Sequence, residues 1–237
     1  MDCRERGLFL SKRVAILQSS YIPWRGYFDL LRSVDEFILY DDAQYTKRDW
    51  RNRNQIKTKD GLLWLSIPVE VKGKFTQAIK DVCISTPGWH DQHFKTISAA
   101  YARAPHFREY RDCLEELFRG ATSTKLSEVN RRFIEGLARI LGITTKISWS
   151  MDYELPEGRV ERLVALCRQA GATSYLSGPS ARAYIDGQPS LFADAGIDVA
   201  YIDYSGYPEY PQLYPPFEQH VSVIDLIVNA GPAAFTA

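Results

Sequence analysis

The sequence of 237 residues lacks an excess of charge, long apolar runs and closely spaced cysteines. Its 29 Lys and Arg balance 29 Asp and Glu, so nothing attracts the whole chain to nucleic acid or to an anionic membrane. Apolar runs such as residues 62–68 are far shorter than the ~20 residues of a membrane-spanning helix. Residues 1–12 contain charges but no apolar segment of signal-peptide length. We therefore expect a cytoplasmic protein whose leader, residues 1–12, is poorly ordered.

Cysteine and histidine are too few and too scattered for the common metal sites. The four cysteines are widely spaced, which predicts reduced thiols, and no two of the four histidines stand at i and i+4. The glycine-rich phosphate loops, the zinc-protease motif and the hydrolase elbow are all absent. The pair Asp41 and Asp42 is the one oxygen-rich feature. We expect neither a metal nor a cofactor.

Short apolar segments alternate with helical stripes over much of the chain. A strand, a loop, a helix and a second strand follow one another in residues 13–40, which predicts a right-handed βαβ unit. Such alternation is typical of an α/β fold with a mostly parallel sheet flanked by helices. The expected strands are residues 13–18, 36–40, 143–149, 173–176 and 197–202.

Two segments depart from this alternation. Residues 54–85 contain short runs separated by glycine turns, which predicts a small antiparallel insert with a further strand over residues 79–84. Residues 88–142 carry three helical stripes and predict a helical lobe that ends at Gly142. No linker rich in Pro, Gly or Ser divides the chain. Residues 13–237 are therefore expected to form one domain.

The loop after the first strand is the first candidate site. Ligands of open parallel sheets bind beyond the carboxyl ends of the strands. Gln18, Tyr21, Trp24 and Arg25 would supply an amide, a phenol, an aromatic face and a charge. The alternative is that Trp24 only packs the helix on the sheet. Nucleotidylyltransferases carry a histidine motif at this place, and this loop has no histidine.

Carboxylates, cations and amides gather after the second strand, where Asp41 and Asp42 end it. Arginine binds phosphate or carboxylate with two hydrogen bonds, and Asn or Gln can bind a base edge or sugar hydroxyls. A charged run is also common on a solvated surface, but the aromatic rings within this one favour binding. One short patch in a neutral chain indicates nucleic acid only weakly. The predicted binding residues are Gln44, Arg48, Trp50, Arg51, Asn52, Arg53 and Asn54.

Two further candidates lie later in the chain. Ser177, Gly178 and Ser180 follow a strand and begin a helix, whose free N–H groups bind anions, although an ordinary helix cap has the same composition. His93 lies on a helical stripe and is either a general base or a partly buried packing residue. The alternative acid–base pair is formed by the last histidine and a nearby carboxylate, His220 and Asp225.

Taken together, these segments resemble the WbqC-like protein family. The resemblance covers roughly residues 13–232 in the same order. It departs at Ser19, where the family often has Pro, and at Ser180 and Ala181, where the family tends to have a second Gly. The segments that carry it are Val14–Gln18, Pro23–Phe28, Tyr40–Tyr45, Arg51–Asn54, Trp89 with His93, Ala100–Pro105, Leu176–Ser180, Tyr210–Gln212 and Ser222–Leu226.

The resemblance implies a transferase that makes or decorates amino sugars of surface polysaccharides, or related metabolites. The implied reaction moves an acyl or aminoacyl group, such as glycyl, from an activated carrier thioester to an amine. The expected partners are a nucleotide-linked or free amino sugar and an acyl- or peptidyl-carrier protein, with no nucleic acid and no membrane insertion. The family motif that ends at Gln212 adds this residue to the expected binding set.

Acyl transfer needs a base for the attacking ammonium and hydrogen-bond donors for the oxyanion. We expect His93 to be the base, because an ordinary imidazole pKa of ~6.5 suits this task. Asp41 or Asp42 would orient the base or hold the amine, and Gln18 or Asn52 would donate to the oxyanion. Two other classes stay open: a non-catalytic nucleotide-sugar or peptide binding or assembly protein, and a ligase- or nucleotidylyltransferase-like enzyme. Binding without turnover would indicate the former, and ATP-dependent product formation the latter.

Overall fold

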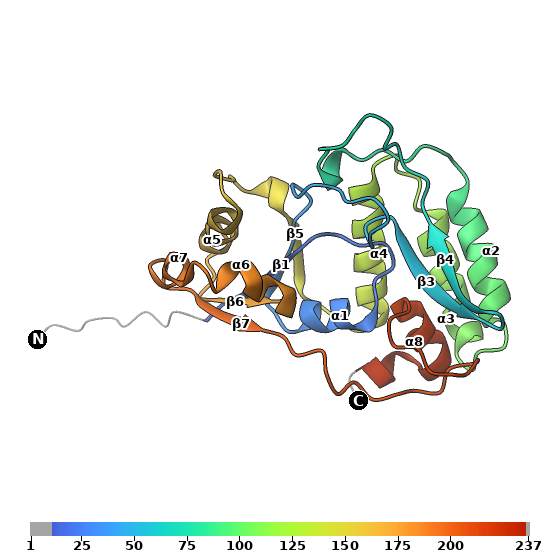
Figure 1. The fold of residues 1–237 in the computed structure, drawn as a ribbon. Helices are drawn as coiled ribbons and strands as arrows, with labels where there is room; N and C mark the ends of the chain where they lie inside the picture. The colour runs from blue at the N-terminus through green and yellow to red at the C-terminus, as the bar shows by residue number, and fades with distance from the viewer. Residues whose placement is uncertain (1–10, 236–237) are drawn as a thin grey trace, which may run out of the picture.

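A five-stranded parallel sheet forms the centre of the molecule (Figure 1). The computed structural model describes residues 11–235, so most of the expected leader lies outside the described residues. The expected α/β fold, a parallel sheet flanked by helices with a small antiparallel insert, is confirmed. In the order β5-β2-β1-β6-β7, the strands are β5 (Lys146–Trp149), β2 (Glu36–Leu39), β1 (Arg13–Leu17), β6 (Ser174–Ser177) and β7 (Asp198–Tyr201).

The order of the strands creates a switch point beside β1. The chain adds β2 and then β5 on one side of β1, and afterwards returns to add β6 and β7 on the other side. The register pairs Ala15 with Phe37 on one side and Val14 with Tyr175 on the other. Connections therefore leave β1 and β6 in opposite directions, which opens a crevice beyond their carboxyl ends.

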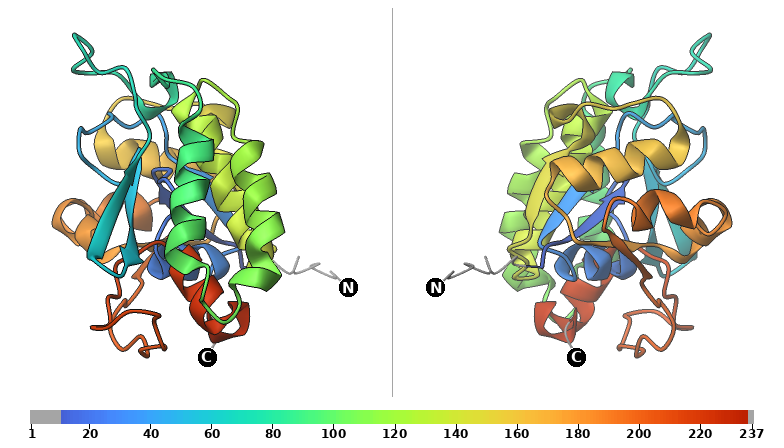
Figure 2. Two further views of the ribbon diagram at one scale, coloured as in Figure 1. Left: turned by 90° about the vertical axis from the view of Figure 1, so that its right-hand side faces the viewer. Right: turned by 90° about the vertical axis from the view of Figure 1, so that its left-hand side faces the viewer.

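Alternate side chains of the strands divide the core into two halves. Phe37 and Leu39 belong to one apolar cluster, whereas Ile16 and Ile38 belong to the other, as the period of two along a strand requires. Helices cover both faces (Figure 2). The first half contains α1 (Arg25–Arg32), α4 (Leu126–Ile140) and α8 (Val223–Ala230), and the second contains α5 (Arg159–Gln169), α6 (Arg182–Ile185) and α7 (Pro189–Ala193).

The connection from β2 to β5 carries the predicted insert and helical lobe. The insert is a hairpin of β3 (Arg53–Thr58) and β4 (Gly61–Ser66). It packs beside α2 (Trp89–Tyr101), which is followed by α3 (Phe107–Arg119) and α4. The hairpin and the lobe therefore sit on the α1 side of the sheet.

The strand expected over residues 79–84 is wrong. Residues Ile79–Asp81 form a short 3-10 helix, η1, followed by isolated bridges from Cys83 to Lys125 and from Ile84 to Val69. The N–H groups of Ile79 and Lys80 donate to carbonyls of the loop after β2, so they cannot form the hydrogen bonds of a β-sheet. The segment bridges two loops and joins no sheet.

Helix α8 was not expected from the sequence pattern. Residues 223–228 are all buried, so no polar face marks the helix. The hydroxyl of Ser222 accepts a hydrogen bond from the N–H of Ile224 and caps its start. The remaining short helices are η2 (Ser150–Asp152), η3 (Pro179–Ala181) and η4 (Pro232–Phe235). In the described part of the chain, no helix is both long and apolar enough to span a membrane.

Candidate functional site

A cavity of about 790 Å³ opens at the switch point between β1 and β6. Three loops that follow parallel strands contribute to its lining: the loop after β1 gives Gln18, the loop after β2 gives Asp42 and Gln44, and the turn after β6 gives Ser177 and Ser180. The carboxyl ends of parallel strands share one edge of a sheet, which is why these distant residues meet. We call this space the switch-point cavity.

Two arginines that the sequence argument missed also line the switch-point cavity. Arg159 and Arg162 lie in the first turn of α5, directly after Gly158. The guanidinium carbon of Arg159 lies 3.6 Å from the ring centroid of Tyr184, and Arg162 Nε donates to the carbonyl of Pro156 at 2.9 Å. Two arginines at i and i+3 on a helix start are visible in the sequence and could have indicated an anion site.

The carboxylate of Asp42 is held in position within the switch-point cavity. It accepts a hydrogen bond from Ser150 Oγ at 2.7 Å and forms an ion pair with Lys80. The neighbouring side chain of Gln44 donates from Nε2 to the carbonyl of Phe75 at 2.8 Å. The lining of the cavity therefore includes one fixed carboxylate and two guanidinium groups.

Asp41, in contrast, is a buried structural residue. Its carboxylate accepts from the N–H of Ser19 at 2.9 Å and from the hydroxyl of Ser127 at the start of α4. Burial raises the pKa of this carboxyl group, although the same hydrogen bonds oppose the rise. Asp41 does not line the switch-point cavity, so its geometry favours anchoring the loop after β1 over contacting a ligand.

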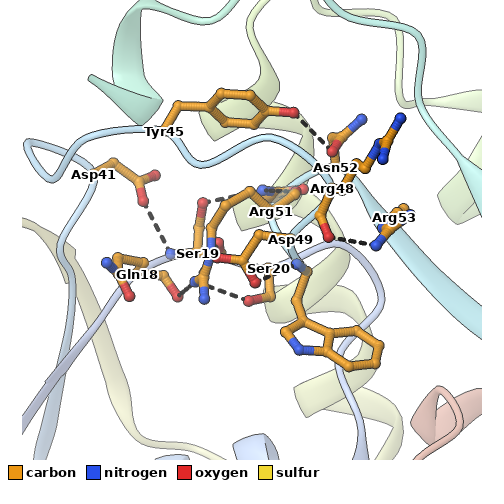
Figure 3. A network of polar contacts seen from close by, with 12 residues as sticks. Gln18, Ser19, Ser20, Asp41, Tyr45, Arg48, Asp49, Arg51, Asn52 and Arg53 are labelled. Carbon is orange, nitrogen blue, oxygen red and sulfur yellow. Dashed lines mark hydrogen bonds and ion pairs between the residues drawn. The ribbon is translucent and has the colours of Figure 1, made fainter. Parts of the chain in front are cut away.

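Arg51 also braces the loop after β1 (Figure 3). Its Nη1 donates to the carbonyls of Gln18 and Ser19 and to the hydroxyl of Ser20, each at 3.1 Å. Asn130 fixes the backbone of Arg51 through a hydrogen bond of 2.9 Å to its carbonyl. These contacts favour a structural role for Arg51, because the guanidinium is committed to the protein's own backbone.

Several other predicted binding residues form hydrogen bonds with the protein's own backbone. Asn52 donates to the carbonyl of Ile67, and Asn54 donates to the carbonyls of Tyr21 and Ile22. Arg53 donates to the carbonyl of Arg48 and lies over the ring of Trp64. Among the predicted binding residues, those that line neither the switch-point cavity nor a second cavity beside Trp24 and His220 are Tyr21, Arg25, Arg48, Asn52, Arg53 and Gln212.

A second cavity of about 290 Å³ lies on the other side of the same loop. Its lining includes three aromatic rings and one imidazole, and Trp24 and His220 have ring centroids 5.2 Å apart. Leu17 lines both spaces, so the second cavity adjoins the first. We call it the aromatic cavity; its residues are Leu17, Ser20, Pro23, Trp24, Tyr27, Trp50, Arg51, Asn54 and His220.

His93 lies in the core between α2 and the hairpin. It is 7% exposed, and its Nδ1 is 2.8 Å from the hydroxyl of Tyr21. Burial lowers the pKa of the imidazole to about 4, against the opposing effect of a hydrogen bond with the backbone of Ser66. His93 lines neither cavity, so the structure favours the packing role over the role of general base.

The alternative acid–base pair does not come together. The buried carboxylate of Asp225 accepts from Tyr101 at 2.7 Å, from Tyr210 at 2.8 Å and from Gln212 at 2.9 Å, while His220 lines the aromatic cavity. Burial raises the pKa of Asp225. Within residues 11–235, no three His, Cys, Asp or Glu side chains converge as ligands for a metal ion.

Comparison with known proteins agrees with the sequence resemblance. A Mycobacterium tuberculosis protein described as uncharacterized protein Rv1507c is 50% identical over 223 residues, which cover 94% of this chain and 96% of that protein. No solved structure gives a significant match. The model of the WbqC-like protein family matches residues 18–237, a span that includes most of the residues lining both cavities. The chain therefore belongs to the WbqC-like protein family.

Proposed function

We propose that the protein is an N-acyl or aminoacyl transferase whose acceptor is an amino sugar that carries phosphate, such as a nucleotide-linked one. The observation that supports this is the charge pattern of the switch-point cavity. Arg159 and Arg162 supply guanidinium groups suited to phosphate, with hydroxyls of Ser177 and Ser180 in the same lining. Asp42 supplies a carboxylate suited to an ammonium group. A molecule with both an ammonium and a phosphate group matches this combination.

The proposed reaction forms an amide and releases a thiol. The ammonium gives up a proton, the free amine attacks the thioester carbonyl, and the tetrahedral oxyanion collapses with loss of the thiolate, which takes a proton. In this proposal Asp42 accepts a hydrogen bond from the ammonium and receives its proton. The side-chain amide of Gln18 donates to the oxyanion. His93 takes no part, because it is enclosed in the core.

A binding experiment tests the acceptor site. Removing Arg162 with Arg162→Ala should weaken UDP-glucosamine binding by about 1.5–3 kcal/mol, the usual contribution of charge-assisted hydrogen bonds. Asp42→Asn should weaken UDP-glucosamine but leave UDP-glucose, which has no amine, unchanged. Isothermal titration calorimetry gives both affinities. Arg168→Ala is the matched control, because Arg168 lies on the same helix, is exposed and does not line the cavity.

The same variants distinguish the alternative functions. Incubation with a glycyl thioester and UDP-glucosamine should yield glycyl amide and free thiol. Binding that responds to Arg162→Ala but gives no product would indicate a binding or assembly protein. Product that requires ATP would indicate a ligase-like enzyme. Unchanged affinity in both Arg162→Ala and Asp42→Asn would contradict the proposed acceptor site.

A further inference from the structure

Exposed apolar side chains concentrate on the hairpin and the loops beside it. Among the described residues, six large apolar side chains are exposed, and five of them fall between residues 50 and 75. Phe75 is the extreme case at 73% exposure. An apolar surface that stays in water is typical of an interaction site. We call this surface the hairpin face and define it by Lys47, Arg48, Trp50, Arg53, Leu62, Trp64, Lys72 and Phe75.

The hairpin face is also positively charged. Residues 47–74 contain eight Lys and Arg against three Asp and Glu, although the whole chain has a net charge of zero. Lys47 Nζ lies 5.2 Å from the ring centroid of Phe75, and the guanidinium carbon of Arg53 lies 4.1 Å from that of Trp64. Neither cation forms an ion pair with another residue of 11–235. The positive charge beside the rings is therefore left for a partner.

Contacts connect the hairpin face to both cavities. Trp64 packs against Trp50 with ring centroids 5.3 Å apart, and Trp50 lines the aromatic cavity. On the other side, the carbonyl of Phe75 accepts the hydrogen bond from Gln44, which lines the switch-point cavity. A protein bound to the hairpin face would lie at the border of the proposed active site.

We infer that the hairpin face is the docking surface of a small acidic protein, the carrier that bears the activated acyl group. This inference rests on the proposed transferase function. Opposite charge speeds and orients the encounter, and aromatic and arginine side chains contribute most of the binding energy at protein interfaces. Nucleic acid fits this surface less well. Leu62 offers exposed aliphatic area, which suits the apolar positions of a protein surface better than phosphates.

Binding of a carrier protein tests the inference directly. The probe is an acyl-carrier protein whose phosphopantetheine arm is loaded with glycine, measured by biolayer interferometry at low and high salt. The double variant Lys47→Glu and Lys72→Glu should weaken binding about tenfold or more, because it turns attraction at the rim into repulsion. Phe75→Ser should weaken it similarly without loss of charge. Both variants alter exposed side chains, and Arg168→Glu on α5 is the matched control.

A turnover assay separates this inference from the proposed function. The charge-reversal variant should raise KM for the loaded carrier about tenfold and leave KM for glycyl-N-acetylcysteamine, a small thioester, unchanged. Equal carrier binding by variant and parent protein would overturn the docking site even if transfer occurs. No product from either thioester, with carrier binding intact, would instead overturn the proposed function. If the parent protein binds a single-stranded oligonucleotide more tightly than the carrier, and the charge-reversal variant loses that binding, the hairpin face is a nucleic-acid site.

Discussion

The surroundings of His93 keep its imidazole neutral. Nδ1 lies 2.8 Å from the hydroxyl of Tyr21, and the ring makes a hydrogen bond with the backbone of Ser66 that favours its protonated form. Burial outweighs this hydrogen bond and lowers the pKa of the imidazole to about 4 from its ordinary value of 6.5. The unfolded chain therefore binds a proton at a pH where the folded protein does not.

This difference predicts a loss of stability in acid. As the pH falls from about 6.5 to about 4, His93 should reduce the free energy of unfolding by up to about 3 kcal/mol, since protonation favours the unfolded state. Urea unfolding of the parent protein and of His93→Gln, at several pH values in this range, measures the contribution of His93 to the free energy of unfolding. The variant should show a flatter dependence of the free energy of unfolding on pH than the parent protein. Identical slopes in the parent protein and His93→Gln would contradict the assignment.

Arg51 provides a second prediction at the scale of one residue. Arg51→Ala removes the donor to the carbonyls of Gln18 and Ser19 and leaves these carbonyls without it. We expect a loss of about 2–4 kcal/mol in the free energy of unfolding, as for charged hydrogen bonds to buried groups. Thermal and urea unfolding measure it, with Arg168→Ala as the exposed control. If Arg51→Ala keeps its melting temperature but loses ligand affinity, Arg51 is a binding residue after all.

The sequence pattern located the candidate loops but could not assign each side chain to ligand or scaffold. Both Arg51 and Arg162 are arginines near a strand's carboxyl end, yet Arg51 donates to residues more than 30 positions away. That choice depends on how β1, β2 and α4 come together, which no local pattern encodes. The resemblance and the strand ends were enough to find Gln18, Asp42 and Ser177.

At the scale of elements, a buried polar cluster holds α8 in place. Tyr101 of α2 and the loop residues Tyr210 and Gln212 all donate to the carboxylate of Asp225. Lys57 of β3 extends the cluster through a hydrogen bond of 2.9 Å from Nζ to Gln212 Oε1. The cluster therefore links the hairpin, the helical lobe and the C-terminal helix.

Removing the carboxylate of Asp225, the centre of this polar cluster, should loosen the hairpin, the helical lobe and α8. Asp225→Ala leaves the hydroxyls of Tyr101 and Tyr210 without their acceptor, which should cost about 3 kcal/mol or more. Asp225→Asn keeps the shape and part of the hydrogen bonds, so its loss should be smaller. Hydrogen exchange should rise in residues 210–213 and 223–230 before it rises in β1. Protection that falls evenly over the sheet as well would show that the cluster has no local role.

Elements with a clear periodicity were predicted, and elements without one were not. The strands β1 and β2 are nearly continuous apolar runs, and α2 to α5 carry stripes with a polar side. Helix α8 is buried on all sides, so its sequence shows no stripe. The segment 79–84 has the composition of a strand, but the neighbouring chain offers it only single-residue bridges.

At the scale of the whole molecule, the two halves of the core share the strands of one sheet. All five tryptophans occur in the first 149 residues, so tryptophan fluorescence does not sample α5, α6 and α7 directly. Ile38 faces that other half, whereas its neighbour Phe37 faces the half with α1. The expected single domain over residues 13–237 can therefore be tested by unfolding.

We expect one cooperative transition. Ile38→Ala should cost about 2–5 kcal/mol and shift the tryptophan transition by as much as the ellipticity transition, although Ile38 belongs to the other half of the core. Phe37→Ala should shift both transitions together in the same way. Fluorescence and far-ultraviolet circular dichroism during urea unfolding measure the tryptophan transition and the ellipticity transition. Separate midpoints for the two signals would indicate two units in place of one domain.

The central position of β1 has a consequence for synthesis on the ribosome. Its first neighbour, β2, follows almost at once, but its second neighbour is β6, and the backbone of Lys12 bonds to the side chain of Thr173, 161 residues further along. The hairpin, the helical lobe, β5 and α5 must all emerge before β6 is made. Throughout that interval the nascent chain has an open strand edge at its own centre, which is the kind of edge that pairs with other chains. Completion of the sheet thus waits until β6 and β7 have been translated, and the second edge of β1 stays unpaired until then.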